Sequence, residues 1–374
     1  MGWWCACLPP AATRSTANVM RVVVAMSGGV DSSVVAGLLH EQGHEVIGVT
    51  LQLYDHGAAV GRKGACCAGQ DIHDARRVAD RLGFAHYVID AEERFRAAVI
   101  KPFADSYAAG ETPVPCISCN QSVKFTDLVQ LSSDLGAERL ATGHYVRRID
   151  GPGGAELHRA VDTARDQSWF LFATTKAQLE RCMFPLGDHP TKAEVRTEAA
   201  RLGLEVAAKP DSQDICFVPQ GSYADVVAKL RPDAMEPGEI VSPEGKVLGR
   251  HDGIARYTIG QAKRLGTAQS ADQRRVVTRL DASTRRVVVD TAPPGATTLR
   301  LRDVNWLTEA HDMRCTVKLR SSETAHGARV VVGDAVDVLL DTPARAAPGQ
   351  ACVFYDGDRV MGGGFISGRN DAER

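Results

Sequence analysis

The chain has 374 residues, of which 44% are hydrophobic and 24% are charged, and its formal net charge is -2. This length favours two or three domains, and the composition indicates neither a disordered chain nor a membrane protein. No apolar run is long enough to span a membrane, so we expect no membrane contact. Because the net charge is close to zero, nucleic acid would have to bind at a local basic patch.

The first twenty residues contain a short apolar stretch with no basic residue before it, which argues against a secretory signal. We expect residues 1–20 to be a disordered extension, or translation to start at Met20. The ten cysteines are irregularly spaced. Without an export signal, such cysteines indicate thiols for redox, metal or sulfur chemistry rather than a disulfide framework. We therefore predict a cytoplasmic protein.

Strands and helices alternate from Arg21 onward. Residues 21–26 form an apolar run typical of a strand buried on both faces, residues 32–42 have helical spacing, and residues 45–53 predict the next strand. We also expect helices at 71–82, 92–107, 123–135, 175–182 and 191–202, and strands at 85–89 and 139–142. This alternation predicts an α/β fold with a doubly wound parallel sheet and ligands at the carboxyl ends of its strands.

The pattern changes after about residue 220 to short β-rich runs separated by Gly, Pro, Asp and Ser, which predict one or two small antiparallel barrels. We expect a catalytic domain over 21–220, a small β-rich domain over 221–292 and a C-terminal β-barrel over 293–374. Between residues 250 and 286, nine Arg or Lys stand against three Asp, an excess of +6. Such a segment is either a solvated face or a surface that binds phosphates.

A glycine loop, Ser27–Ser33, lies between the first strand and the first helix. Successive N–H groups at the positive end of a helix dipole suit phosphate. The loop is neither a Walker A sequence nor a dinucleotide fingerprint. It resembles the pyrophosphatase loop of enzymes that split ATP into AMP and pyrophosphate, in which Asp31 can help to hold Mg²⁺. Alone, it leaves argininosuccinate synthetase, GMP synthetase and tRNA thiolases open.

Cys116 and Cys119 form a Cys-x-x-Cys on a proline-stiffened loop that we expect to enter a helix, where a thiolate is stabilised and its pKa lowered. Cys216 lies in a second polar loop. A structural zinc site needs two more ligands, and no second Cys-x-x-Cys or His pair is present. We expect the cysteines without comparable context to be core or incidental thiols: Cys66, Cys67, Cys182, Cys315 and Cys352.

Taken in order, these blocks resemble the tRNA-specific 2-thiouridylases, the tRNA-uridine 2-sulfurtransferases of the bacterial MnmA type. The resemblance runs from about Arg21 to Ser367 and includes residues 112–125, 141–145 and 211–217. It implies a PP-loop ATP-pyrophosphatase domain, of adenine nucleotide alpha hydrolase-like fold, followed by two small β-rich domains. It also implies 2-thiolation of the wobble uridine of tRNA through an adenylated uridine, with ATP and Mg²⁺ as cofactors. A cysteine desulfurase or sulfur-relay protein would supply the sulfur.

The resemblance also assigns roles to residues. In that family the position matching Cys119 is the nucleophile, and the position matching Cys216 carries a persulfide and can form a disulfide with it. The ATP site is implied at Ala25, Met26, Ser27, Gly28, Gly29, Val30, Asp31, Ser32, Leu51 and Gly143. The target base is implied to meet Val114, Pro115 and Cys116. The implied tRNA contacts are His144, Arg165, Asp166, Gln167, Arg320, Ser321 and Gln350.

Aromatic and basic side chains suggest further RNA contacts. Tyr145 and Trp169 can stack on or hydrogen-bond an unpaired base beside His144. Tyr257, Lys263 and Arg264 place an aromatic ring and two charges in the basic segment, which suits phosphates. Ser321 replaces an aromatic residue common in the family, so base stacking there is in doubt.

Cys116 is a departure from the family pattern, because many members have Asp at this position. Three cysteines, Cys116, Cys119 and Cys216, are therefore an alternative ligand set for a [4Fe–4S] cluster with one iron open to hydrosulfide. Two other functions stay open: a ligase of the argininosuccinate or GMP synthetase type, and a non-catalytic tRNA-binding or redox-sensing protein.

Overall fold

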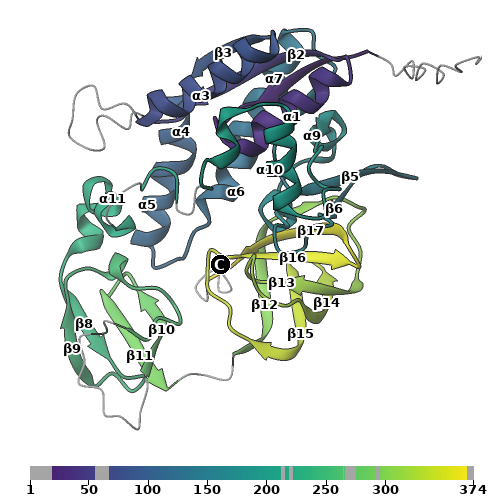
Figure 1. The fold of residues 1–374 in the computed structure, drawn as a ribbon. Coiled ribbons are helices and arrows are strands. Elements are labelled where there is room, and N and C mark those ends of the chain that lie inside the picture. The colour runs from purple at the N-terminus through teal and green to yellow at the C-terminus, as the bar shows by residue number, and fades with distance from the viewer. Residues whose placement is uncertain are drawn as a thin grey trace, which may run out of the picture.

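The computed structural model describes residues 19–54, 67–211, 215–218, 222–263, 265, 275–291 and 295–368, which form three lobes (Figure 1). Of the extension expected over residues 1–20, residues 1–18 lie outside the described residues. Among the helices of the described ranges, none is long and apolar enough to cross a membrane.

The first lobe is built on a five-stranded parallel sheet with the strand order β3-β2-β1-β4-β7. The strands are β1 Arg21–Ala25, β2 Glu45–Gln52, β3 Ala85–Asp90, β4 Arg139–Ala141 and β7 Cys182–Met183. The chain order reverses between β1 and β4, and a parallel sheet forms its ligand crevice at the carboxyl ends beside such a reversal. The predicted doubly wound sheet is confirmed.

Helices cover both faces of this sheet. Along β1, Val22 and Val24 pack in one cluster with α1, α3 and α10, whereas Val23 packs in another with α7. These helices are α1 Val30–Glu41, α3 Cys67–Leu82, α7 Thr126–Asp134 and α10 Lys192–Arg201. Successive strand residues point to opposite faces, so the all-apolar run of β1 is explained by burial on both sides.

The cysteine segment is helical earlier than the sequence predicted. A helix was expected from residue 123, but α6 Pro115–Cys119 already begins at Pro115 and continues through the π-helical turn η2 Asn120–Phe125 into α7. Cys116 and Cys119 therefore lie within the helix, not in a loop before it. Proline is favoured in a first helical turn, where its missing N–H costs nothing, and this start signal was overlooked.

A chain of short helices connects β3 to this cysteine helix. It comprises α4 Glu92–Phe95, the π-helical η1 Arg96–Ile100 and α5 Lys101–Ala108. Three further helices follow β4: α8 Ser168–Leu171, α9 Lys176–Arg181 and the 3₁₀ helix η3 Glu205–Ala208.

The second lobe is a four-stranded sheet in the order β10-β11-β8-β9, preceded by α11 Tyr223–Leu230 and η4 Pro232–Met235. Its strands are β8 Gly238–Val241, β9 Val247–His251, β10 Arg275–Asp281 and β11 Arg286–Thr291, with η5 Ile254–Arg256 after β9. The pair β8 and β11 is parallel, so a purely antiparallel lobe was the wrong expectation.

The third lobe is the predicted β-barrel. Six strands pair in the order β12-β15-β14-β13-β16-β17, and β17 pairs again with β12 to close the ring. They are β12 Ala296–Trp306, β13 Met313–Lys318, β14 His326–Val332, β15 Val336–Ala344, β16 Ala351–Asp356 and β17 Arg359–Ile366.

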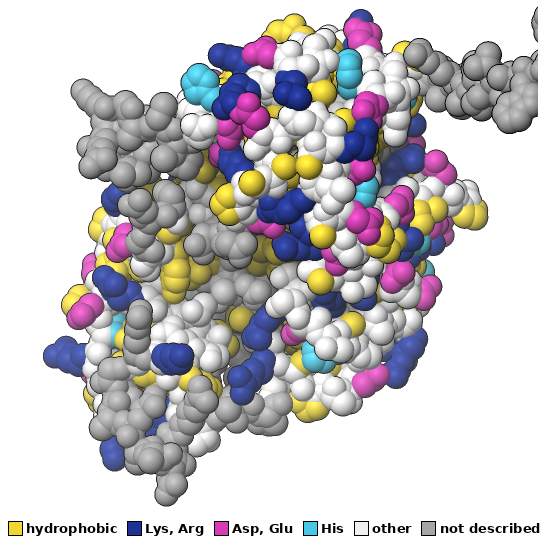
Figure 2. Space-filling view, viewed as in Figure 1, with side chains coloured by type: hydrophobic (Ala, Val, Ile, Leu, Met, Phe, Trp, Pro, Cys, Tyr) yellow, Lys and Arg dark blue, Asp and Glu magenta, His cyan; other side chains and the backbone are white. Residues whose placement is uncertain are grey.

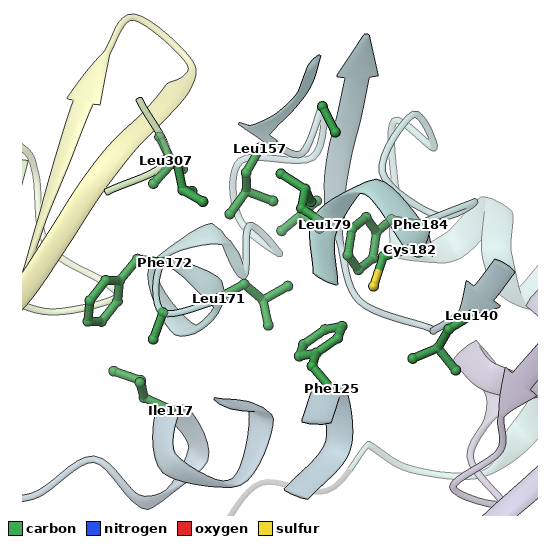
Figure 3. Close-up of a cluster of buried hydrophobic side chains, with 14 of the residues drawn as sticks. Ile117, Phe125, Leu140, Leu157, Leu171, Phe172, Leu179, Cys182, Phe184 and Leu307 are labelled. Atoms are coloured by element: carbon green, nitrogen blue, oxygen red, sulfur yellow. The ribbon is translucent and has the colours of Figure 1, made fainter. Parts of the chain in front are cut away.

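A hairpin from the first lobe extends this barrel sheet. The hairpin consists of β5 Val146–Gly151 and β6 Gly154–Arg159, and β6 pairs with β17 through His158 and Arg359. Leu157 and Phe172 share a buried cluster with Leu307, which follows β12 (Figure 3). The barrel is thus joined to the first lobe by both backbone pairing and a common core.

Asn305 adds polar contacts across this junction, because its Nδ2 donates to the carbonyl oxygens of Phe172 (2.7 Å) and Thr174 (3.0 Å). We predict that Asn305→Ala destabilises the barrel junction by about 1–3 kcal/mol, since both carbonyls lose their donor. Urea unfolding measures the change. Thr298→Ala, at an exposed site on the same strand, is the control and should change stability little. Equal effects of the two substitutions would contradict the junction role.

Candidate active site

The glycine loop forms a tight turn between β1 and α1. Gly28 has φ +74°, a left-handed conformation that favours glycine, and a Cβ there would overlap the backbone of Asp71. The Ser27 amide donates to Ser32 Oγ (3.1 Å), and Ser33 Oγ donates to the Gly29 carbonyl (2.8 Å). The loop is therefore held closed at the N-terminus of a twelve-residue helix, a geometry that suits a phosphate.

Asp31 is bound on both of its carboxylate oxygens. Lys192 Nζ lies 2.6 Å from each oxygen, and the Tyr145 hydroxyl donates to Oδ1 at 2.7 Å. Lys192 also contacts Asp211 Oδ1 at 3.2 Å. The predicted oxygen ligand for Mg²⁺ is present, but the metal would have to compete with the Lys192 ammonium. Sequence reasoning missed Lys192, because an isolated lysine carries no spacing signal.

A second lysine, also missed, supports the other side of the loop. Lys209 Nζ donates to the Gly28 carbonyl (2.9 Å) and to carboxylates of Asp71 (2.7 Å) and Asp74 (2.6 Å). These contacts tie the glycine loop to α3 and to the segment after η3. The Lys209 side chain is only 26% exposed, so the ion pairs lie partly shielded from water.

The remaining residues implied for ATP meet at the same edge of the sheet. Leu51 lies at the carboxyl end of β2, beside β1. Gly143 follows β4, and a Cβ there would approach Ser32 N to 2.9 Å and Asp31 Cβ to 3.0 Å. Only glycine lets the β4 loop lie so close to the first turn of α1. The ten residues of the implied ATP site thus lie on the end of β1, the glycine loop, the start of α1, the end of β2 and the loop after β4.

The two cysteines implied for chemistry come together although 97 positions separate them in the chain. Cys119 is 6% exposed and shares a buried cluster with Phe95, Phe103 and Phe217. Phe217 is the neighbour of Cys216, whose own side chain is exposed, and the two thiols interact electrostatically. The exposed Cys116 lies three residues before Cys119 on α6.

The thiol pKa values are raised, contrary to the expectation from the helix start. Burial among apolar rings raises the pKa of Cys119. Loss of water around the Cys216 sulfur, caused by the surrounding protein, raises the pKa of that thiol to about 11. Lys124, on the π-helical turn η2, acts in the opposite direction on both cysteines. Burial would lower the pKa of the Lys124 ammonium, but the three neighbouring sulfurs hold it above its usual range. Lys124 is therefore the positive charge of the thiol site.

His144 connects the thiol site with the glycine loop. It follows Gly143, stacks on Phe125 with ring centroids 5.9 Å apart, and has Nδ1 2.8 Å from Thr142 Oγ1. Burial and the Lys124 charge lower the His144 pKa to about 3, so the ring is neutral at physiological pH. His144 therefore lies next to the glycine-loop contact of Gly143 in the chain and near enough to Lys124 to feel its charge.

Two aromatic side chains expected to face RNA are buried instead. Tyr145 is 3% exposed and bonds to Asp31, while Trp169, also 3% exposed, donates from Nε1 to the Lys318 carbonyl (3.2 Å). Neither ring can stack on a base in this conformation. Their apolar surfaces pack in the core, which an aromatic residue next to a motif does not reveal.

The residues implied for tRNA contact lie in the first lobe and in the barrel. Arg165 pairs with Asp211 (3.0 Å), Asp166 accepts from the Ser168 amide (3.1 Å), and Gln167 Oε1 accepts from the Tyr145 amide (2.9 Å). Arg320 is exposed and Ser321 is half-buried at the turn after β13. Gln350 donates to the Thr112 carbonyl at 2.9 Å, close to the half-buried Val114 and buried Pro115.

No group of three or more His, Cys, Asp or Glu side chains in the described ranges is arranged to hold a metal ion. The described positions of Cys116, Cys119 and Cys216 therefore give no support to the alternative [4Fe–4S] ligand set. Cys182 and Cys352 are buried, as expected for core thiols, and Cys315 is half-buried. Cys66 lies outside the described residues.

Lys124 should control the reactivity of the Cys119 and Cys216 thiols. We predict that Lys124→Met raises the pKa of Cys119 and Cys216 further, because it removes a nearby positive charge and keeps the alkyl chain. Since the thiolate is the reactive form, alkylation by iodoacetamide slows at any pH below the pKa. Mass spectrometry of the separate peptides as a function of pH measures this. Lys176→Met, at an exposed site on α9, is the control, and equal rates in both variants would refute the role.

Comparison with known proteins agrees with this arrangement. Three family models match: "tRNA methyl transferase HUP domain" over residues 20–220, "tRNA methyl transferase PRC-barrel domain" over 224–291 and "Aminomethyltransferase beta-barrel domain" over 296–366. The tRNA-specific 2-thiouridylase MnmA of Acidiphilium cryptum is 69% identical over 93% of this chain and 100% of its own length. The MnmA proteins of Gluconobacter oxydans and Paracoccus denitrificans are 61% and 57% identical over 93% and 96% of this chain, covering 99% and 93% of their own lengths. The chain therefore belongs to the tRNA-specific 2-thiouridylase family.

Proposed function

We propose that the protein is a tRNA-uridine 2-sulfurtransferase, which uses ATP to convert the wobble uridine of tRNA to 2-thiouridine in the cytoplasm. The proposal is supported by a series of contacts: Gly143 packs on the first turn of α1, the adjoining His144 stacks on Phe125, and Cys119 shares a buried cluster with Phe217. A phosphate site alone suits many ATP-consuming enzymes. Two distant cysteines beside it point to sulfur as the group transferred.

In the first step, O2 of the uracil attacks the α-phosphorus of ATP, forms an O–P bond and expels pyrophosphate. This step is required because a carbonyl oxygen is a poor leaving group, whereas AMP is a good one. The glycine-loop amides and the α1 dipole suit the phosphates. A base reacts at its edge only when it is unstacked and splayed out. We place it beside Val114, Pro115 and the exposed Cys116.

In the second step, sulfur displaces AMP from C2 of the base. A persulfide on Cys216 carries the sulfur. Cys119 attacks the inner sulfur, releases the terminal sulfur as hydrosulfide and leaves a Cys119–Cys216 disulfide. The hydrosulfide then adds to C2. Alternatively, the persulfide attacks C2 directly and Cys119 cleaves the adduct, with the same disulfide as product. A thiol reductant restores both cysteines, and a cysteine desulfurase or relay protein reloads Cys216.

The competing proposals differ in the group transferred. A cluster route would place hydrosulfide on iron held by the three cysteines, but the described side chains do not form such a ligand set, and we derive no step through it. A ligase of the argininosuccinate or GMP synthetase type would use a nitrogen nucleophile and would not need Cys119 or Cys216. A non-catalytic tRNA-binding or redox-sensing protein would not turn over ATP.

The two thiols should be needed for sulfur transfer but not for activation of the base. We predict that Cys119→Ser and Cys216→Ser lower wobble-uridine thiolation by at least about 10³-fold, because each removes a covalent step. Both should retain ATP–pyrophosphate exchange that depends on unmodified tRNA. Nucleoside mass analysis and labelled pyrophosphate measure the two activities.

Cys182→Ser, at a core thiol, is the control for these substitutions. Full thiolation by both variants would contradict the site assignment, and exchange without tRNA would favour a ligase. Iron and sulfide analysis of anaerobically purified protein separates the two sulfur routes: iron-free protein active at full rate supports the persulfide.

We place part of the tRNA surface on the second lobe. Figure 2 shows a hollowed face between the lobes, bordered by apolar and basic side chains. In the basic segment, Lys263 and Arg279 are exposed, whereas Arg285 and Arg286 pair with Glu236 and Glu239. Tyr257 is buried at 7% exposure, so its ring is not available to RNA. Arg264 lies outside the described residues.

Lys263 and Arg264 should contribute to tRNA binding by releasing counterions from phosphates. We predict that Lys263→Ala with Arg264→Ala weakens tRNA binding and lowers the slope of log affinity against log salt by about two. Fluorescence titration at several salt concentrations gives the slope. Arg286→Gln is the control, because Glu239 already neutralises that charge. An unchanged slope in the double variant would rule out phosphate contact.

A further inference from the structure

The segment that leads into the cysteine helix is held by hydrogen bonds to the barrel. Arg302 Nη2 donates to Glu111 Oε2 (2.7 Å), the Thr112 amide donates to the Pro348 carbonyl (2.8 Å), and Gln350 Nε2 donates to the Thr112 carbonyl (2.9 Å). Gly349, with φ +85°, packs between them, since a Cβ there would lie 3.1 Å from Thr112 N. We call these four barrel residues the barrel clamp. They hold Glu111 and Thr112, which only Pro113 separates from Val114–Cys119.

The strand that carries Arg302 is shaped for this contact. β12 and β17 lose their regular register between Arg302 and Asn305, and Asp303 has φ +51°, which is unusual for a residue other than glycine. Such bulges re-aim side chains away from the regular alternation of a strand. Arg302 is thereby directed to Glu111, and Asn305 to the carbonyls of Phe172 and Thr174.

The second lobe reaches the same segment from the other direction. Gly110, with φ +80°, ends the α5 region, and a Cβ there would lie 3.0 Å from Leu280 Cβ on β10. Arg231, after α11, pairs with Asp105 on α5 at 2.8 Å. Residues 110–112 are therefore the place where both β-rich lobes contact the polypeptide that continues into the thiol site.

We propose that the barrel clamp is a positioning element for sulfur transfer: by fixing Glu111 and Thr112, it sets where the Cys116–Cys119 turn stands relative to the base. This inference rests on the proposed function. It assigns Gln350 and Arg302 a role in the free protein, in addition to any contact with tRNA. A displacement of about 1 Å in a reacting group is enough to cost roughly 100-fold in rate, so a clamp on the adjoining backbone can control the chemistry.

The test uses Arg302→Met, Glu111→Gln and the double variant of the full-length protein. Amide hydrogen exchange over residues 112–119 and alkylation of the exposed Cys116 report the position of the turn without requiring activity. In both single variants the amide hydrogens of residues 112–119 should exchange faster than in wild type. The double variant should show the same amide exchange rates as the single variants, because each change removes the same Arg302–Glu111 ion pair. At saturating tRNA, the thiolation rate should fall roughly tenfold while the tRNA KM stays within about twofold.

Arg300→Met is the matched control. Arg300 lies two residues away on β12 and pairs with Asp337 (3.0 Å) inside the barrel, so its loss should leave both readouts unchanged. Amide hydrogen exchange at wild-type rates in Arg302→Met would overturn the proposal. A raised KM for tRNA with an unchanged maximal rate would also overturn it, because these side chains would then only bind tRNA. If wild type fails to thiolate tRNA, the proposed function fails, and the exchange comparison still decides the clamp.

Discussion

Backbone has to approach backbone at Gly28 and Gly143, since neither position has room for a Cβ. The first contact presses the glycine loop against the start of α3, and the second presses the β4 loop against the first turn of α1. From that second contact the chain continues to His144, which stacks on Phe125 beside Lys124. Close packing at Gly143 thus sets how near the β4 loop, which carries His144, lies to the first turn of α1, and a larger residue there would push the two apart.

Positive charge is distributed over both halves. Lys192 and Lys209 hold the carboxylates and the carbonyl around the glycine loop, and Lys124 lies among the three sulfurs. Burial raises the pKa of the Cys119 thiol, which disfavours the thiolate, the form that reacts. Lys124 partly offsets that burial. The result is a thiol that is protected at rest and stands beside the charge that a thiolate needs in order to react.

Much of the fold could be predicted from the sequence, because its signals are local. The all-apolar run of β1, the helical spacing of α1 and the β-rich runs of the last lobe each depend on short stretches, and each prediction is confirmed. The hairpin β5–β6 could not be assigned to the barrel sheet, since its pairing with β17 joins residues about 200 positions apart. The parallel pairing of β8 with β11 was missed for the same reason.

The residues of the candidate site likewise divide into those that local sequence signals reveal and those that only the fold reveals. Motifs located the glycine loop, Cys119 and Cys216, because their residue types are informative in sequence. Lys124, Lys192 and Lys209 carry no such signal, and their importance appears only when the fold brings them to sulfur or carboxylate. The lowered pKa expected for the cysteine helix was wrong because burial among Phe95, Phe103 and Phe217 depends on tertiary packing. Tyr145 and Trp169 were expected at the RNA surface and are buried for similar reasons.

The central claim is that the uracil oxygen leaves on AMP, and its fate can be followed directly. A tRNA carrying ¹⁸O at O2 of the wobble uridine is incubated with the enzyme, ATP and a sulfur donor, and the AMP is analysed by mass spectrometry. The account predicts one ¹⁸O in AMP for each 2-thiouridine formed. If 2-thiouridine accumulates while AMP contains no ¹⁸O, the uridine is not adenylated, and the proposed use of the phosphate loop is contradicted.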